Sequence, residues 1–177
     1  MSEPSRIANN TERSSLELRV LTSPTRVIAG DPNRTFSPPT STLIVGASDA
    51  VLVDALLIGE DVDALGDMIA STGRTLATIF ITYGHGEHFF GSDRLIARFP
   101  GARSDHPRYR RLYYFPYRGG REVVSSYFGD TVATPTSRPS QLDGDVIDLE
   151  GHELRVIEVA RAISRRAPCS TSQRSMP

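Results

Sequence analysis

The chain has 177 residues, of which 38% are hydrophobic and 23% are charged, and its formal net charge is −1. This composition is typical of a globular protein of one domain, and it excludes recruitment to nucleic acid or acidic membranes by overall charge. No apolar run approaches the about 18 residues of a membrane span, and the first residues lack the apolar stretch of a secretory signal. The single cysteine, Cys169, excludes an internal disulfide framework, so we expect a cytoplasmic protein.

The N-terminal part predicts a tail, a strand and a loop. The polar segment 1–14 is expected to be disordered. Leu16, Leu18 and Val20 alternate with charged residues, which is typical of a half-buried strand. Residues 30–39 contain three prolines and a glycine and therefore predict a loop.

A β-hairpin is predicted next. Two apolar runs, Thr42–Val45 and Val51–Asp54, flank the turn segment 46–49. Asp54 closes the second strand, where an aspartate commonly serves as a turn or capping residue.

A helix, a strand and a second helix follow the hairpin. Residues 60–71 predict an amphipathic helix that ends before Gly73. The apolar positions on one face of this helix are Val62, Leu65, Met68 and Ile69. The continuous apolar run 75–81 predicts a parallel strand that is buried on both faces. The second helix is predicted over about 88–98.

The loop after this strand carries the clearest chemical signal. It contains two of the four histidines, His85 and His88, with Glu87 between them. Imidazole and carboxylate together form the ligand set of zinc, iron or manganese. Because the loop follows the C-terminal end of a buried strand, rigid backbone can point these groups into a cleft. We therefore predict a metal site; the alternative is a surface loop with incidental histidines.

The segment Thr82–His88 resembles the Thr-His-x-His-x-Asp-His signature of hydrolases with the metallo-β-lactamase fold. The likeness extends over about residues 35–159. It implies an α/β fold, the N-terminal half of an αββα sandwich, in which a mixed sheet carries helices on one face. It also implies one or two zinc ions at His85, Glu87 and His88, with Glu87 in the catalytic carboxylate position. In the family, the metal lowers the pKa of a bound water, which then attacks an ester, a lactam or a similar bond of a small molecule.

The resemblance has further consequences for Asp54 and Tyr83. It suggests that Asp54 lies behind the metal loop and supports it, so both roles of this residue stay open. Tyr83 stands where the family has its first metal histidine, and Glu87 replaces an aspartate. Tyr83 is a possible ligand position, but a phenol with an ordinary pKa of about 10 is a poor zinc ligand at neutral pH. We therefore expect this chain to be an impaired hydrolase.

Two alternatives to an impaired hydrolase remain. The first is a non-catalytic remnant or binding protein that uses the segment 103–127, in which arginines interleave with aromatic residues. That composition occurs in proteins that bind single-stranded nucleic acid, but also in amphipathic helix pairs, so nucleic acid is not the expected partner. His106 in this segment is expected to be a cap or surface residue. The second alternative is a complete hydrolase in which an oligomer supplies the missing ligands.

The C-terminal part predicts one more hairpin and then loses its pattern. Residues 146–149 and 153–159 alternate around the turn 150–152, which includes His152. The resemblance implies a metal histidine after Val159, yet residues 160–177 are irregular. Our hypothesis is that these last residues are an out-of-frame tail, so the domain covers 15–159.

A half-sandwich has a consequence for association. If the second half of the fold is missing, one face of the sheet has no partner layer. Leu43, Val45, Leu52, Val53, Ile79 and Ile81 are the candidates to line the two faces of the sheet. Because exposed apolar surface favours contact between proteins, we expect a homo-oligomer formed through this face.

Overall fold

The computed structural model describes residues 15–107, 117–133 and 137–157. The predicted tails, 1–14 and 160–177, lie outside the described residues, so their disorder and reading frame stay predictions. None of the described helices is long and apolar enough to cross a membrane.

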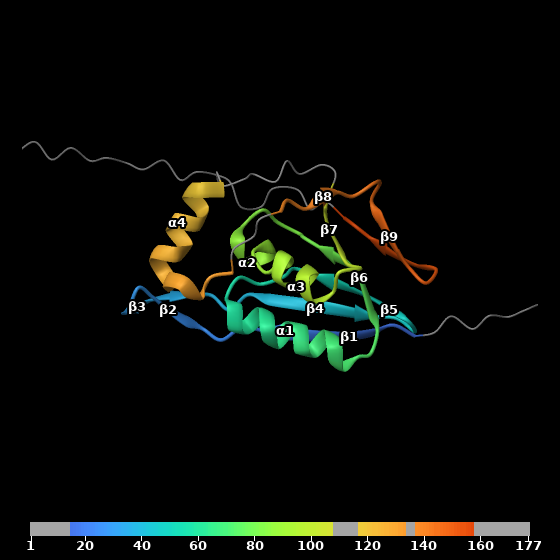
Figure 1. Cartoon of the computed structure of the whole chain (residues 1–177), viewed down its shortest axis with the longest axis horizontal. Coiled ribbons are helices and arrows are strands. Elements are labelled where there is room, and N and C mark those ends of the chain that lie inside the picture. Colours follow the sequence, from blue (N-terminus) through green and yellow to red (C-terminus); the bar gives the residue numbers. More distant parts are fainter. Residues whose placement is uncertain (1–14, 108–116, 134–136, 158–177) are drawn as a thin grey trace, which may run out of the picture.

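One six-stranded sheet organises the described chain (Figure 1), with the strand order β1-β4-β5-β6-β7-β8. The strands are β1 (Glu17–Thr22), β4 (Thr40–Val45), β5 (Asp49–Val53), β6 (Thr75–Phe80), β7 (Arg103–His106) and β8 (Ser140–Gln141). The neighbouring pairs β1–β4 and β4–β5 are antiparallel, and the pairs from β5 to β8 are parallel. The predicted mixed sheet and the parallel strand over about 75–81 are therefore confirmed.

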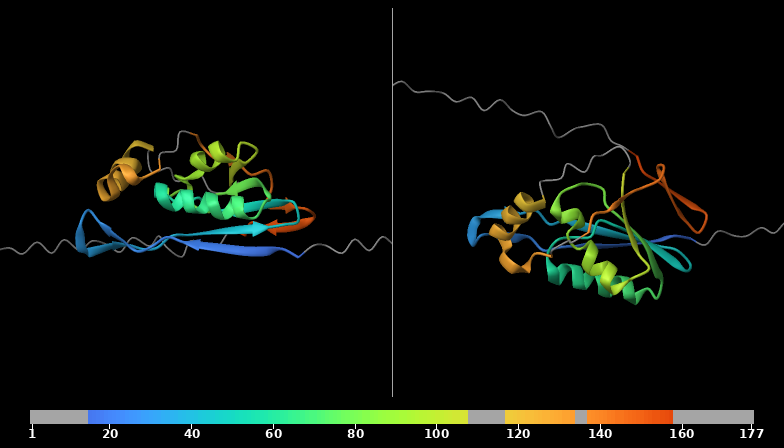
Figure 2. Two further views of the ribbon diagram at one scale, coloured as in Figure 1. Left: turned by 60° about the horizontal axis from the view of Figure 1, so that its bottom comes forward. Right: turned by 45° about the horizontal axis from the view of Figure 1, so that its top comes forward.

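The helices next to the sheet lie on one of its faces (Figure 2, left), as predicted. They are α1 (Gly59–Ser71), α2 (Gly86–Phe89) and α3 (Ser92–Arg98). Leu65 and Ile69 of α1 are fully buried and belong to the same core cluster as Leu43 and Leu52 of the sheet. The apolar face expected of the first helix is therefore the face that packs on the sheet.

A second, smaller core lies on the other face of the sheet. The hairpin of β9 (Val146–Leu149) and β10 (His152–Arg155) packs Ile147 and Leu149 with Val51 and Phe80. Farther along this face, on β1, Leu18 is 65% exposed. The helix-free face is thus covered at one end and open at the other.

The predicted loop over residues 30–39 is largely wrong. An antiparallel hairpin, β2 (Arg26–Ile28) with β3 (Asp31–Phe36), occupies much of it. Its turn uses Gly30 at a φ of 75°, a left-handed conformation that glycine adopts readily. Pro32 is tolerated because a two-stranded ribbon has outer edges where no amide proton is needed.

Helix α4 (Tyr117–Phe128), which leads into a short 3-10 helix, η1 (Gly129–Thr131), packs against this hairpin. The rings of Phe36 and Phe128 meet edge to face, with centroids 5.3 Å apart. The amide of Ala29 donates a hydrogen bond to the carbonyl of Tyr127 at 3.1 Å. These contacts attach a hairpin outside the main sheet to the helical layer.

The helix predicted over about 88–98 is confirmed from Ser92 to Arg98, which form α3, but its first residues belong to the separate helix α2, with Gly91 between the two helices. A Cβ atom at Gly91 would lie 2.1 Å from the carbonyl oxygen of Ala55. The backbones meet there through a hydrogen bond of 2.9 Å from the Gly91 amide to the Leu56 carbonyl. Because the two backbones approach so closely, the position between α2 and α3 has room only for glycine, which has no Cβ atom.

The turn of the β9–β10 hairpin also differs from its prediction. Glu150 and Gly151, at φ values of 55° and 82°, make the turn, whereas His152 begins β10. The Glu150 carboxylate accepts hydrogen bonds of 2.6–2.7 Å from the amides of Ala47, Ser48 and Asp49. These hydrogen bonds favour the ionised form and lower the pKa of Glu150. The hairpin is thereby tied to the turn between β4 and β5.

Candidate functional site

The candidate site lies where the parallel strands β5 and β6 end. Asp54 follows β5 directly, and its amide donates to the carbonyl of Phe80 at the end of β6, at 2.9 Å. Its φ of 63° lies in the left-handed region, which aspartate tolerates better than most residues. The Ser41 hydroxyl donates to the Asp54 carbonyl at 2.6 Å. The backbone therefore fixes the position of the Asp54 side chain.

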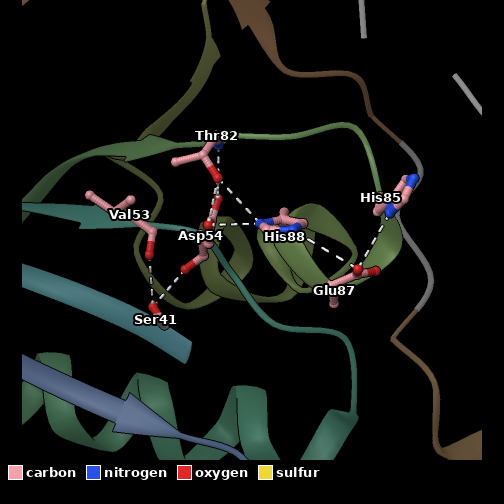
Figure 3. Close-up of polar contacts among 7 residues, drawn as sticks. All are labelled: Ser41, Val53, Asp54, Thr82, His85, Glu87 and His88. Carbon is pink, nitrogen blue, oxygen red and sulfur yellow. Dashed lines mark hydrogen bonds and ion pairs between the residues drawn. The ribbon is translucent and has the colours of Figure 1, made fainter. Parts of the chain in front are cut away.

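Three polar groups contact the carboxylate of Asp54 at hydrogen-bond distance (Figure 3). Oδ1 accepts a hydrogen bond from the Thr82 amide at 2.8 Å, and Oδ2 accepts one from the Thr82 hydroxyl at 2.7 Å. Nδ1 of His88 lies 2.8 Å from Oδ2. Because an ionised carboxylate only accepts, this contact places the proton of a neutral His88 on Nδ1. Asp54 is 8% exposed, so its carboxylate is largely shielded from water.

The pKa of His88 reflects this environment. Burial by itself lowers the pKa of an imidazole, because it disfavours the charged form. The hydrogen bond and charge of Asp54, with a smaller contribution from the charge of Glu87, outweigh burial and raise the pKa of His88 above 6.5. Asp54 therefore both orients the ring and favours its protonated form.

The other two predicted ligands, His85 and Glu87, lie on the outer side of His88 (Figure 3). Oε1 of Glu87 is 3.5 Å from Nδ1 of His85 and 3.9 Å from Nε2 of His88. The carboxylate therefore sits beside both imidazoles, at ion-pair distance.

These residues do not fit a catalytic metal centre as they stand. In the described part of the chain, no group of three or more His, Cys, Asp and Glu side chains is arranged to hold a metal ion. Catalytic zinc usually has three protein ligands with an open fourth position. The assignment of His85, Glu87 and His88 as ligands, and of Glu87 as the catalytic carboxylate, stays a prediction.

Tyr83 occupies the space beside the two histidines. Its ring centroid lies 4.4 Å from that of His85 and 5.8 Å from that of His88, edge-on in both cases. The phenol ring of Tyr83 thus lies next to the imidazole rings of both His85 and His88. The chain places an aromatic ring next to both candidate ligands without adding a nitrogen donor.

The loop backbone is anchored from two sides. Within the loop, the His88 amide donates to the His85 carbonyl at 3.0 Å, and the His88 carbonyl accepts from the Ala55 amide at 2.7 Å. A Cβ atom at Gly86 would lie 3.0 Å from the Phe90 ring. The glycine in the loop therefore lets the chain pass close to a core aromatic ring.

Two residues of the network were missed in the sequence. Thr82 was part of the motif, so its hydroxyl could have been chosen as a partner for a carboxylate. Ser41 lies 13 positions from Asp54, and no sequence signal connects them. His106, predicted as a cap or surface residue, ends β7, and its Nδ1 lies 2.9 Å from the Pro107 carbonyl oxygen.

The Arg- and Tyr-rich segment 103–127 is only partly described, because residues 108–116 lie outside the described ranges. Its first residues form β7, not the helix considered for them, and Arg103 lies 2.7 Å from the buried carboxylate of Asp105. Its last residues belong to α4. A binding role for this segment stays untested.

Known proteins resemble this chain in architecture. No known family profile and no curated protein matches the sequence. Among solved structures, a metallo-β-lactamase family protein from Thermus thermophilus is similar with a TM-score of 0.50 and 23% identity, over 78% of this chain and 50% of that chain. A mutant of the FEZ-1 metallo-β-lactamase from Legionella gormanii is similar with a TM-score of 0.50 and 18% identity, over 66% and 45%.

At 18–23% identity, the similarity to these solved structures shows a shared fold and nothing more. The chain spans about half the length of these solved structures. The predicted fold class and the resemblance are therefore confirmed at the level of architecture, and the half-length match agrees with the expected half of a sandwich.

Proposed function

The chain has part of the metallo-β-lactamase fold, and from this premise we propose that it derives from metal-dependent hydrolases but has no turnover of its own. In this proposal, His85, Glu87 and His88 bind zinc weakly, and the chain is a non-catalytic relative of the hydrolases. We place it in the cytoplasm, as its single cysteine favours.

The proposal rests on one observation. The carboxylate that would position a metal-binding histidine is present, whereas the set of residues that would bind the metal is incomplete. Asp54 lies 2.8 Å from Nδ1 of His88, an arrangement that metal-binding histidines commonly have with a carboxylate. The opposite nitrogen, Nε2, faces Glu87. At position 83, however, a tyrosine ring takes the place of a nitrogen donor.

The geometry around Tyr83 supports a specific test. Because its ring adjoins both His85 and His88, an imidazole at this position would have two others within reach. The variant Tyr83→His should therefore bind zinc at least about tenfold more tightly than the wild type, a gain of about 1.4 kcal/mol. Tyr83→Phe is the matched control, since it keeps the ring and adds no donor.

The experiment is a zinc titration by calorimetry on the purified chain and both variants, with a chromogenic ester and a chromogenic lactam assayed in parallel. We expect wild type and Tyr83→Phe to bind with a dissociation constant of about 1 μM or weaker. Hydrolysis should stay near background in all three. Glu87→Asp should change the affinity little, because it shortens one ligand without adding another.

A different outcome would change the assignment. Stoichiometric zinc in the wild type, with turnover that His88→Ala abolishes, would contradict the proposal and favour a complete hydrolase assembled as an oligomer. Equal affinity of wild type and Tyr83→His would show that the two histidines do not act together.

A further inference from the structure

The turn between β4 and β5, residues 46–49, presents three consecutive backbone amides to one carboxylate. The amides of Ala47, Ser48 and Asp49 donate to the two carboxylate oxygens of Glu150 at 2.7, 2.6 and 2.7 Å. Consecutive amides of a turn that point to a common centre form an anion-binding concavity, called a nest. Glu150 is 101 positions from Asp49 in the sequence. The nest therefore binds a carboxylate from a distant part of the chain.

The shape of the nest is set by backbone contacts that do not involve Glu150. The Gly46 amide donates to the Asp49 carbonyl at 2.8 Å and closes the turn, from which β4 and β5 continue as an antiparallel pair. The Ser48 carbonyl accepts a hydrogen bond of 2.9 Å from the amide of Thr75, the first residue of β6. The three amides are thus held in place from two sides. A preorganised site of this kind loses less entropy when it binds a ligand.

Glycine at position 46 leaves the space that the carboxylate fills. A Cβ atom at Gly46 would lie 2.9–3.1 Å from three atoms of the Glu150 carboxylate, which are the atoms nearest to it. The charge of Arg74, just before β6, also favours a negative charge at Glu150, although less than the three hydrogen bonds do. The nest thus combines donors, room and a positive charge, which together suit a carboxylate.

The turn of the β9–β10 hairpin gives no separate reason for a glutamate at position 150. Its two central residues, Glu150 and Gly151, have φ values of 55° and 82°. Two-residue hairpin turns in which both φ angles are positive favour asparagine, aspartate or glycine at the first position. A glutamate is unusual there. Its contact with the nest accounts for the residue where the turn does not.

Glu150 attaches the tip of this hairpin to the main sheet. In the described chain, β9 and β10 form a two-stranded sheet of their own. Ile147 and Leu149 belong to one apolar cluster with Val51 and Phe80 of the main sheet. The hydrogen bonds of Glu150 add a polar attachment at the tip. The Glu150 side chain thus acts as a ligand that is tethered to the hairpin and docks it.

We propose that the turn 46–49 is a carboxylate-binding site whose resident ligand is the Glu150 side chain and which binds a free carboxylate when that side chain is absent. A tethered ligand has a high effective concentration, so a free carboxylate competes poorly in the wild type. A carboxylate from another molecule occupies the nest only after the hairpin tip has left it. The proposal does not depend on the chemistry of the histidine loop.

The test uses Glu150→Asn in the full chain, with formate as the probe. Asparagine suits the φ of 55° but is shorter and uncharged, so the hairpin turn should persist while the nest is emptied. Nuclear magnetic resonance follows the amide protons of residues 47–49 as formate replaces chloride at constant ionic strength. In the wild type, these protons should resonate downfield and ignore formate. In Glu150→Asn, they should lose the downfield shift and regain it saturably with formate.

The matched control adds Gly46→Ala to Glu150→Asn. The φ of Gly46 lies outside the left-handed region, so alanine is not strained there. Its methyl group would take the space in which the Glu150 carboxylate lies in the wild type. The amides of this double variant should therefore not respond to formate, whereas a general effect of the salt would act on both variants equally.

Two results would overturn the site: formate leaves the amides of 47–49 unchanged in Glu150→Asn, or it shifts them equally in the double variant. Hydrogen exchange tests the docking role. The hairpin amides should exchange faster in Glu150→Asn than in the wild type, and formate should not restore their protection, because the free anion is not attached to the hairpin. Equal exchange rates in the two proteins would contradict docking by Glu150.

Discussion

Asp54 and His88, 34 positions apart in the sequence, lie with a carboxylate oxygen 2.8 Å from an imidazole nitrogen. The contact joins the end of β5 to α2 and runs through a carboxylate that also accepts two hydrogen bonds from Thr82. It connects the candidate site to the folded core, so its removal should lower the stability of the fold.

Asp54→Ala should lower the free energy of unfolding by about 2–4 kcal/mol. The amide and hydroxyl of Thr82 and Nδ1 of His88 would lose a shared acceptor in a shielded position. Asp54→Asn is the matched comparison and should cost less, because asparagine keeps an acceptor and tolerates the φ of 63°. Urea unfolding of the three proteins measures the difference; equal stabilities would contradict a structural role for the carboxylate.

The stability contributed by His88 should depend on pH in a defined direction. Its folded pKa is raised above 6.5, so protonated His88 is favoured in the folded state. This contribution is fully present below the unfolded pKa of about 6.5 and is lost as the pH rises through the folded pKa. The difference in unfolding free energy between wild type and His88→Gln should shrink over that window. A difference that grows with pH would contradict the prediction.

Glu150→Gln should lower the midpoint of urea unfolding at neutral pH. The carboxylate accepts three backbone hydrogen bonds from residues 47–49, which lower its pKa. The contribution of a group with a lowered pKa is present above its unfolded pKa and lost as the pH falls through the folded value. The gap between the two proteins should therefore close in acid. Glu153→Gln, on the same hairpin, is the control and should have little effect at either pH.

Gly91→Ala should destabilise the chain by about 3 kcal/mol or more. A Cβ atom there would lie 2.1 Å from the backbone carbonyl oxygen of Ala55 and 2.6 Å from a methyl group of Val62. Neither backbone nor a buried valine can move away easily. Gly101→Ala is the control, since a Cβ atom at Gly101 would have no neighbour within 4 Å. Thermal unfolding should show a large shift for the first variant and a small one for the second.

The sequence by itself determined the elements whose hydrophobic pattern is local and regular. The alternation of Leu16, Leu18 and Val20, the helical spacing around Leu65, and the apolar run that became β6 each predict an element from neighbouring residues alone. The strand-loop-helix order then placed His85 and His88 at the C-terminal edge of a parallel sheet. The motif also marked Tyr83 as the position where the ligand set departs from the family.

Only the tertiary structure decided features that depend on residues far apart in the chain. The β2–β3 hairpin, which lies where a loop was predicted, is stabilised by α4, which packs on it through the rings of Phe36 and Phe128. The break at Gly91 comes from its approach to Ala55, and the role of Asp54 comes from its contact with His88. Long-range packing and buried hydrogen bonds stabilise these features, and no local pattern records which distant residues will meet.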